Sequence, residues 1–260
     1  MSYLNEIDAW KISMILMFVT FALTVLGYKL GKLKLRKQKV NASAESSSSF
    51  GSLSGLLFLL LAFTFSMSVT RYDTRRQIII EEANNISTAI LRADLYEEKE
   101  RLLFRNDFKQ YVESRINYYK VGRDIEKTNL SNRQTQTIST NLWKRASRLS
   151  HNYSNTDATR QMIPALNAMF DITTTRSAAE KAKVPDSIIW LLFILACICS
   201  FYSGYLSTLK GSFDWLVEFI FCIMISVTIL FIFDLDRPFR GFVTLDESNK
   251  TIIELRNCFN

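Results

Sequence analysis

The sequence is poor in the residues that build most soluble active sites: its 260 residues include one histidine, four cysteines and three prolines. Because His151 is the only histidine, a metal site made from several histidines is excluded. His151 stands in a polar stretch typical of a solvated surface. The cysteines form no CxxC pair, and GxxxxGKS/T, GxGxxG and HExxH motifs are absent. We therefore expect a protein that is not an enzyme and that has no cofactor and no metal site.

Charged residues make up 22% of the chain, yet four windows of the sequence contain none. These windows cover residues 12–28, 52–70, 187–209 and 219–233. An α-helix rises about 1.5 Å per residue, so about 17 to 25 residues cross the hydrocarbon core of a bilayer. The windows predict four transmembrane helices, the fourth reaching back toward Phe213 if Asp214 and Glu218 lie at the membrane surface.

The first window has a cleaved signal peptide as its alternative. Glu6 and Asp8 stand where a signal peptide carries positive charge, and basic residues follow the window where a small-residue cleavage site belongs. We expect the first span to be retained.

The polar region between the second and third spans has the periodicity of helices. Ile79, Ala83, Ile86, Ile90 and Ala93 recur at alternating steps of four and three. Similar apolar stripes predict helices over about 96–119, 131–149 and 156–180, and sustained period-two alternation is absent.

This pattern predicts an all-α membrane protein with four transmembrane helices and a helical soluble domain inserted between spans 2 and 3. The predicted parts are an N-terminal transmembrane pair (1–70), a water-facing helical domain (71–186), a C-terminal transmembrane pair (187–235) and a tail (236–260).

The second span continues into the polar region without a glycine or proline, as LLAFTFSMSVTRYDTRRQIIIEEANNISTAILRADL. We expect one long helix across this boundary. On one face, bulky apolar residues give way to hydroxyls toward Arg71. This face carries Leu56, Leu59, Phe63, Ser66 or Met67, and Thr70, and it is followed by the basic residues Arg71, Arg75 and Arg76. Rings of such side chains around a symmetry axis would form a constriction that gates by dewetting. Packing of this face against other spans or lipid is the alternative.

Three segments carry a resemblance to a known family. AFTFSMSVTRYDTRR, EEANNISTAILRADL and, after the fourth span, DLDRPFRGF resemble the bacterial bestrophin-like membrane proteins, which are distantly similar to the bestrophin anion channels. The resemblance covers most of the chain and implies a pentameric channel in the bacterial inner membrane, with second spans that line a central pore. It places an apolar neck on Leu59 and Phe63, while the preceding turn falls on Gly55, where a bulky residue is expected.

The tail departs from the animal bestrophins, which bind calcium with an acidic cluster after the last span. Here the nearby acidic residues are Asp234, Asp236, Asp246 and Glu247, interrupted by Arg237 and Arg240. Calcium prefers about six to eight oxygen ligands. We expect no calcium site of that type, and a structural ion pair of Asp236 with Arg237 or Arg240.

The leading functional hypothesis is a passive ion channel, anion-preferring because Arg71, Arg75 and Arg76 would surround one pore mouth, although Asp73 offsets their field. Its expected partners are the lipid bilayer, further copies of the chain and inorganic ions. The alternative is a non-conducting sensor or scaffold whose helical domain binds a partner, and four spans alone could also fold as a monomer. Nucleic acid is not expected, because six of the basic residues behind the net charge of +7 lie at 29–39, beside the membrane.

The orientation of the soluble domain stays open. The first loop and the short loop near Lys210 hold seven basic residues, against five in the N-terminal segment and the tail. The positive-inside rule then places the first loop in the cytoplasm and the large domain outside. The resemblance implies the opposite orientation.

Overall fold

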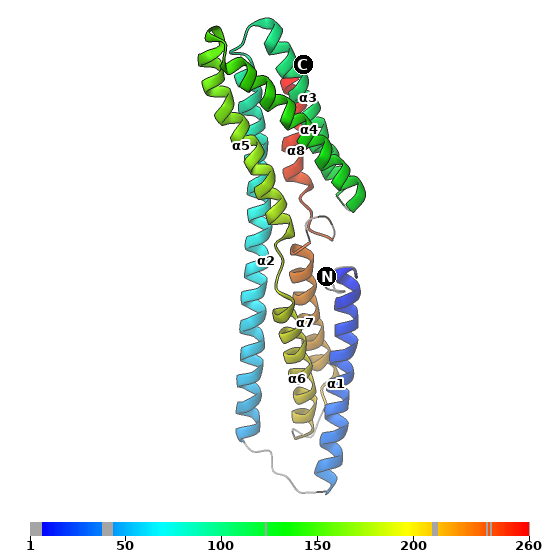
Figure 1. Cartoon of the computed structure of the whole chain (residues 1–260). Coiled ribbons are helices and arrows are strands. Elements are labelled where there is room, and N and C mark those ends of the chain that lie inside the picture. Colours follow the sequence, from blue (N-terminus) through cyan, green and yellow to red (C-terminus); the bar gives the residue numbers. More distant parts are fainter. Residues whose placement is uncertain are drawn as a thin grey trace. The chain divides into compact units, whose positions relative to one another are not determined.

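The structure, a computed structural model, describes residues 7–37, 44–122, 124–209, 213–237, 239 and 241–259. This part of the chain is helical and contains no β-strand. The helices in order are α1 (Ala9–Lys37), α2 (Ala44–Ala93), α3 (Glu98–Lys120), α4 (Ile125–Ser150), α5 (Thr156–Lys181), α6 (Asp186–Leu209), α7 (Trp215–Leu235) and α8 (Asp246–Glu254) (Figure 1). Short 3-10 helices cover Tyr153–Asn155 and Leu255–Phe259. The all-α prediction is confirmed.

The chain divides into two compact units. The first, here called the span unit, comprises Met1–Arg71 and Lys183–Arg237. The second, the helical unit, comprises Tyr72–Ala182 and Pro238–Asn260. Helix α2 is continuous, as its sequence predicts, and contributes residues to both units.

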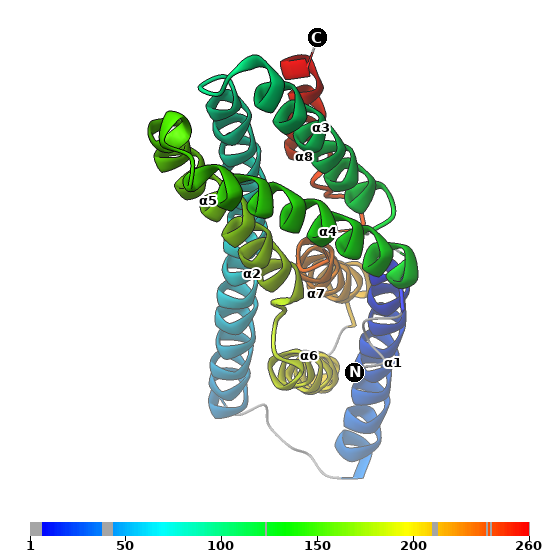
Figure 2. The ribbon, with the colours of Figure 1, turned by 45° about the horizontal axis from the view of Figure 1, so that its top comes forward.

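The span unit contains α1, the first part of α2, α6 and α7. Four helical stretches of the described residues are long and apolar enough to cross a membrane. They cover most or all of each of α1, α2, α6 and α7. Helix α1 packs along both α6 and α7 (Figure 2). The apolar core includes Ile12, Leu16, Leu57, Leu61, Leu192, Ile225 and Ile229. Asp214 caps the first turn of α7, where its carboxylate accepts hydrogen bonds from the backbone N–H groups of Leu216 and Val217.

Glycines allow α1 and α6 to touch backbone to backbone. A Cβ atom on Gly27 would lie 2.0 Å from the carbonyl oxygen of Phe201, and one on Gly204 would lie 1.9 Å from that of Thr24. Gly31 follows four residues after Gly27, and a Cβ atom there would clash with the side chain of Thr208. Small residues at such crossings let membrane helices gain dispersion contacts along their backbones.

The helical unit is built from the second part of α2 with α3, α4, α5 and α8. Helix α3 packs on α4, and α4 packs on α5 (Figure 2). The predicted stripes are buried: the core contains Ile79, Ile86, Ile90, Phe104, Phe108, Leu142, Ala146, Met162, Leu166 and Met169. Pro164 lies inside α5, and Ile252 of α8 joins the same core, so part of the expected tail belongs to this unit.

Several residues used in the sequence analysis lie outside the described residues. They are Glu6, Lys39, Lys210, Pro238 and Arg240.

The glycine crossing gives a first prediction. Gly204→Ala forces the α1 and α6 backbones apart and is expected to lower the stability of the folded chain by about 1–3 kcal/mol, the usual cost of overpacking. Gly55→Ala is the matched control, because a Cβ atom there meets nothing within 4 Å, and it is expected to be neutral or slightly stabilising. Thermal unfolding in mild detergent measures both variants. Equal midpoints for the two would contradict the crossing.

Candidate functional site

One narrow stripe of α2 is packed inside the span unit. It consists of Leu57, Leu61, Thr64 and Ser68, which recur at steps of four, three and four and are buried. Leu57 and Leu61 belong to the apolar core of the unit. At about 100° per residue, these four side chains project to the same side of the helix.

The predicted neck residues lie on the opposite side of α2. Leu59 and Phe63 stand about half a turn from the packed stripe and are 52% and 60% exposed in the single chain. Leu56 beside them is also exposed, and Ser66 and Thr70 continue the same face as exposed hydroxyls. The predicted face is therefore exposed in the single chain, and its role in lining a pore stays a prediction.

Two phenylalanines mark the flank of the exposed face. Phe58 and Phe65 project at an angle between the packed stripe and the neck side. The ring of Phe58 packs edge to face on Phe221 of α7, with the centroids 6.1 Å apart. These two side chains differ from Leu59 and Phe63 mainly in helical phase.

The three predicted mouth arginines have different environments. Arg76 is exposed, and Arg71 is partly buried, where its guanidinium forms an ion pair with Asp236 at 3.7 Å. Arg75 is 2% exposed, with Nε donating to the carbonyl of Ala179 and Nη2 to that of Ala182. A cation at a helix C-terminus is favourable because the free carbonyls carry partial negative charge. The expectation that Arg75 presents its charge at a pore mouth is therefore corrected: it binds the end of α5.

Asp236 has a partner that the sequence did not indicate. Its described ion pair is with Arg71, and its Oδ2 accepts a hydrogen bond of 2.9 Å from the backbone N–H of Val184, just before α6. Arg237, one of the two expected partners, donates to the carbonyl of Ile7 and lies over the ring of Phe233. The carboxylate of Asp236 thus joins the end of α7 to the start of α6.

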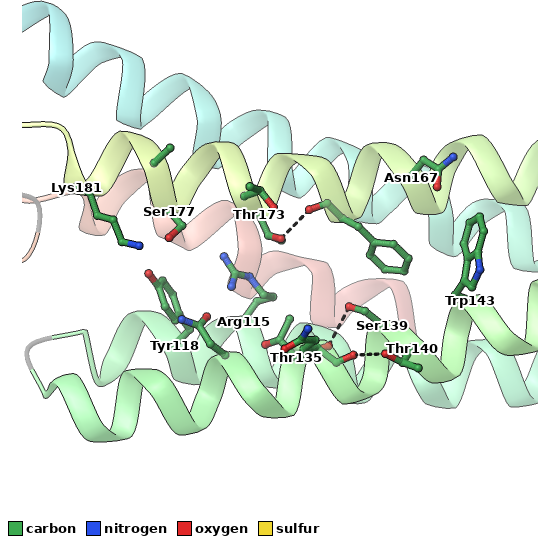
Figure 3. A pocket seen from close by; sticks show the side chains of 15 residues that line it. Arg115, Tyr118, Thr135, Ser139, Thr140, Trp143, Asn167, Thr173, Ser177 and Lys181 are labelled. Carbon is green, nitrogen blue, oxygen red and sulfur yellow. Dashed lines mark hydrogen bonds between the residues drawn. The ribbon is translucent and has the colours of Figure 1, made fainter.

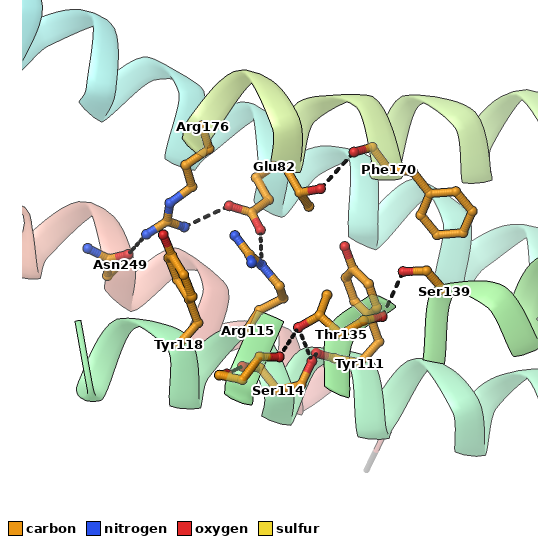
Figure 4. A network of polar contacts seen from close by, with 12 residues as sticks. Glu82, Tyr111, Ser114, Arg115, Tyr118, Thr135, Ser139, Phe170, Arg176 and Asn249 are labelled. Atoms are coloured by element: carbon orange, nitrogen blue, oxygen red, sulfur yellow. Dashed lines mark hydrogen bonds and ion pairs between the residues drawn. The ribbon is translucent and has the colours of Figure 1, made fainter. Parts of the chain in front are cut away.

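A buried ion network is the main polar feature of the helical unit (Figure 4). The carboxylate of Glu82 on α2 accepts a hydrogen bond from Nε of Arg115 on α3 at 2.5 Å and one from Nη1 of Arg176 on α5 at 2.7 Å. Arg176 also donates to Glu180 and to Asn249 of α8. The network therefore joins α2, α3, α5 and α8.

Burial and charge act on Glu82 in opposite directions. Complete burial raises the pKa of its carboxyl group, but the guanidinium groups of Arg115 and Arg176 outweigh burial and lower the pKa from 4.5 to about 2. The sequence analysis did not select Glu82. The available signal was its position three residues after Ile79 and four before Ile86, which places an acid on the buried stripe of α2.

The described part of the chain contains no cluster of side chains that could bind a metal ion. No group of three or more histidine, cysteine or acidic side chains gathers there. His151 is exposed at the C-terminal end of α4, in the solvated position that its sequence surroundings predict.

Comparison with known proteins places this arrangement in a family. A family model described as a Bestrophin-like domain matches residues 16–249. The chain belongs to the bestrophin-like family. The crystal structure of a bacterial bestrophin homologue from Klebsiella pneumoniae, which carries a tyrosine-to-alanine mutation, is similar, with a TM-score of 0.66. The match covers 95% of this chain and 98% of that one at 12% identity, so it shows a shared fold. No curated protein matches the sequence.

The network of this bestrophin-like chain gives a second prediction. Because the pKa of Glu82 is lowered on folding, its carboxylate stabilises the folded chain above pH 4.5, and this contribution declines as the pH falls from 4.5 toward 2. Glu82→Gln is expected to cost about 3–5 kcal/mol at neutral pH, because two buried guanidinium groups lose their counter-ion.

The measurement is the thermal midpoint in mild detergent between pH 6 and pH 3. The Glu82→Gln midpoint is expected to depend less on pH than that of the parent chain. Glu81→Gln is the matched control, since Glu81 is the exposed neighbour, and its curve is expected to follow the parent. Parallel curves for all three proteins would show that Glu82 carries no such linkage.

Proposed function

We propose that this bestrophin-like chain is a passive ion channel of the bacterial inner membrane, formed by several copies whose α2 helices surround a central pore. The observation that carries the proposal is the two-sided character of α2. One stripe is packed in its own span unit, while the opposite face exposes Leu59 and Phe63 and then the hydroxyls of Ser66 and Thr70. The family and the four apolar helices support a membrane location.

The barrier in such a pore is the cost of removing water from an ion. Rings of Leu59 and Phe63, with Leu56 beside them, would form a narrow hydrocarbon neck that offers an ion no oxygen or charge. Beyond the neck, Ser66 and Thr70 would allow the ion to regain water. The packed stripe on the other side of α2 holds each wall of the neck to its own span unit, so widening requires a change in packing.

Anion preference would arise from charge at the mouth rather than from the neck. Arg71 and Arg76 are the candidates, since the buried Arg75 is bound to α5. Asp236 pairs with Arg71, and Asp73 is exposed beside them, so the positive field is partly offset. We therefore propose a modest preference for anions over cations.

Assembly is the first requirement of this proposal. Native mass spectrometry in mild detergent is expected to find a multiple of the 30.1 kDa chain, with five copies favoured by the resemblance to bestrophins. A single chain across all mild detergents would remove the pore and favour a monomeric bundle.

The neck gives the functional prediction. Purified protein in liposomes is expected to conduct chloride above empty vesicles, and sodium less. Leu59→Ala with Phe63→Ala widens the neck and lets it wet, so flux is expected to rise by about tenfold, equivalent to about 1.4 kcal/mol of barrier.

Phe58→Ala with Phe65→Ala is the matched control, because it removes apolar bulk from the flank of α2 and not from its neck face. This variant is expected to lower thermal stability through lost packing with Phe221, without a rise in flux per assembled complex. Equal flux from both variants and the parent would show that Leu59 and Phe63 do not line the path. No flux from the parent at any pH tested would favour a non-conducting sensor or scaffold.

A further inference from the structure

A cavity open to solvent lies in the helical unit, between α3, α4 and α5, and polar side chains stand among a largely apolar lining surface (Figure 3). Its volume is about 780 Å³, within the range of about 300–1,000 Å³ that is usual for small-molecule sites. Its lining includes Arg115, Lys181, Thr173, Ser177, Ser139 and Trp143. None of these residues belongs to the exposed face of α2 that carries Leu59 and Phe63.

One end of the cavity is cationic. Arg115 donates through Nε to Glu82, and the described residues provide no hydrogen-bond partner for its two terminal Nη groups. Figure 3 shows its guanidinium toward the same end of the cavity as the ammonium group of Lys181. Among the described charges here, Arg115 and Arg176 pair with Glu82, Arg176 also pairs with Glu180, and Lys181 lines the cavity. Three cations and two carboxylates leave one positive charge in excess.

The middle of the cavity presents hydrogen-bond acceptors. The hydroxyl of Thr173 donates to the carbonyl of Phe170 at 2.7 Å, and that of Ser139 donates to Thr135 at 2.9 Å (Figure 3). Thr140 donates to Gln136 in the same way. Because each of these protons is used within its own helix, the hydroxyl oxygens keep lone pairs for a donor. A ligand with O–H groups suits this wall.

The far end of the cavity is aromatic. Trp143 is 39% exposed and lines the cavity beside Asn167 (Figure 3). Its indole offers a flat apolar surface to C–H groups, and among the described residues its N–H has no hydrogen-bond acceptor, so it can donate to a ligand.

We propose that this cavity binds a small hydroxylated carboxylate. The carboxylate lies against Arg115 and Lys181, the hydroxyl groups donate to the Ser139 and Thr173 wall, and the carbon chain packs on Trp143. A planar guanidinium edge matches a planar carboxylate, and one excess positive charge suits a monoanion. An acid without hydroxyl groups makes none of the hydrogen bonds that this wall can accept.

Isothermal titration of the full chain in mild detergent tests the proposal with gluconate as the probe. Sorbitol has a similar chain of hydroxyl groups without the carboxylate, and acetate has the carboxylate without that chain. Gluconate is expected to bind saturably, and both comparators at least about tenfold more weakly. Absence of saturable gluconate binding, or equal binding of sorbitol, overturns the proposal.

Two exposed positions locate the site without disturbing the buried network. Lys181→Gln is expected to weaken gluconate binding by about two- to fivefold, the size of an exposed charge interaction. Trp143→Ala is expected to weaken it further by loss of the apolar surface. Arg133→Gln is the matched control, because it removes an exposed charge from α4 at a separate cavity, and its affinity is expected to equal that of the parent.

Unchanged gluconate affinity in both Lys181→Gln and Trp143→Ala would place binding elsewhere and overturn the assignment. The thermal midpoints of the three variants are expected to match the parent, which separates a lost site from a lost fold. Binding is measured without ion flux, so its failure leaves the channel proposal unaffected, and the reverse also holds.

Discussion

The helical unit depends on a carboxylate that has no contact with water. A buried, unpaired Glu82 would cost several kcal/mol, so this unit is stable only when the guanidinium groups of α3 and α5 both reach it. A buried ion pair adds little net stability, but it penalises every arrangement of the helices in which a partner is missing. Through Arg176 and Asn249, the same requirement extends to α8 near the end of the chain. The wall of the cavity follows from it, because Glu82 holds Arg115 in place.

The span unit is held together by a different kind of interaction. Some of its hydroxyls donate within their own helix, as Thr20 does to the carbonyl of Leu16. Others join neighbouring helices, as Ser13 of α1 does to the carbonyl of Ser226 in α7 and Ser203 of α6 does to the carboxylate of Glu218 in α7. Between α1 and α6, the glycines bring the backbones into contact, so dispersion forces supply the attraction. Lipid chains are as apolar as leucine, so hydrophobicity alone would not select one neighbour over another. The shape of the glycine crossing provides that selection.

The sequence predicts features that depend on the spacing of residues along one helix. It does not predict contacts between residues that are distant in the sequence. The four spans and the buried stripe through Ile79 and Ile86 follow from hydropathy along one helix, and the structure agrees with them. The assignment of Leu59 and Phe63 to a neck rests on the same kind of pattern and stays a prediction. Arg75 was misplaced because its acceptors are carbonyls of α5, more than a hundred residues away. Glu82 was overlooked because a single acidic residue among apolar ones is expected to be exposed. Its burial is explained only by Arg115 and Arg176, which are distant in the sequence. Whether the neck face lines a pore depends on other copies of the chain.

The guanidinium of Arg115 makes three different contacts at once. The Nε edge of its guanidinium is bound to Glu82, its terminal nitrogens border the cavity, and its flat face lies 4.7 Å from the ring centroid of Tyr118. Lysine keeps the charge, but its ammonium has neither a second edge nor a planar face. A lysine at this position could not bind Glu82 and present donors to the cavity at the same time. Arg115→Lys would therefore lose either the hydrogen bond to Glu82 or the charge at the cavity.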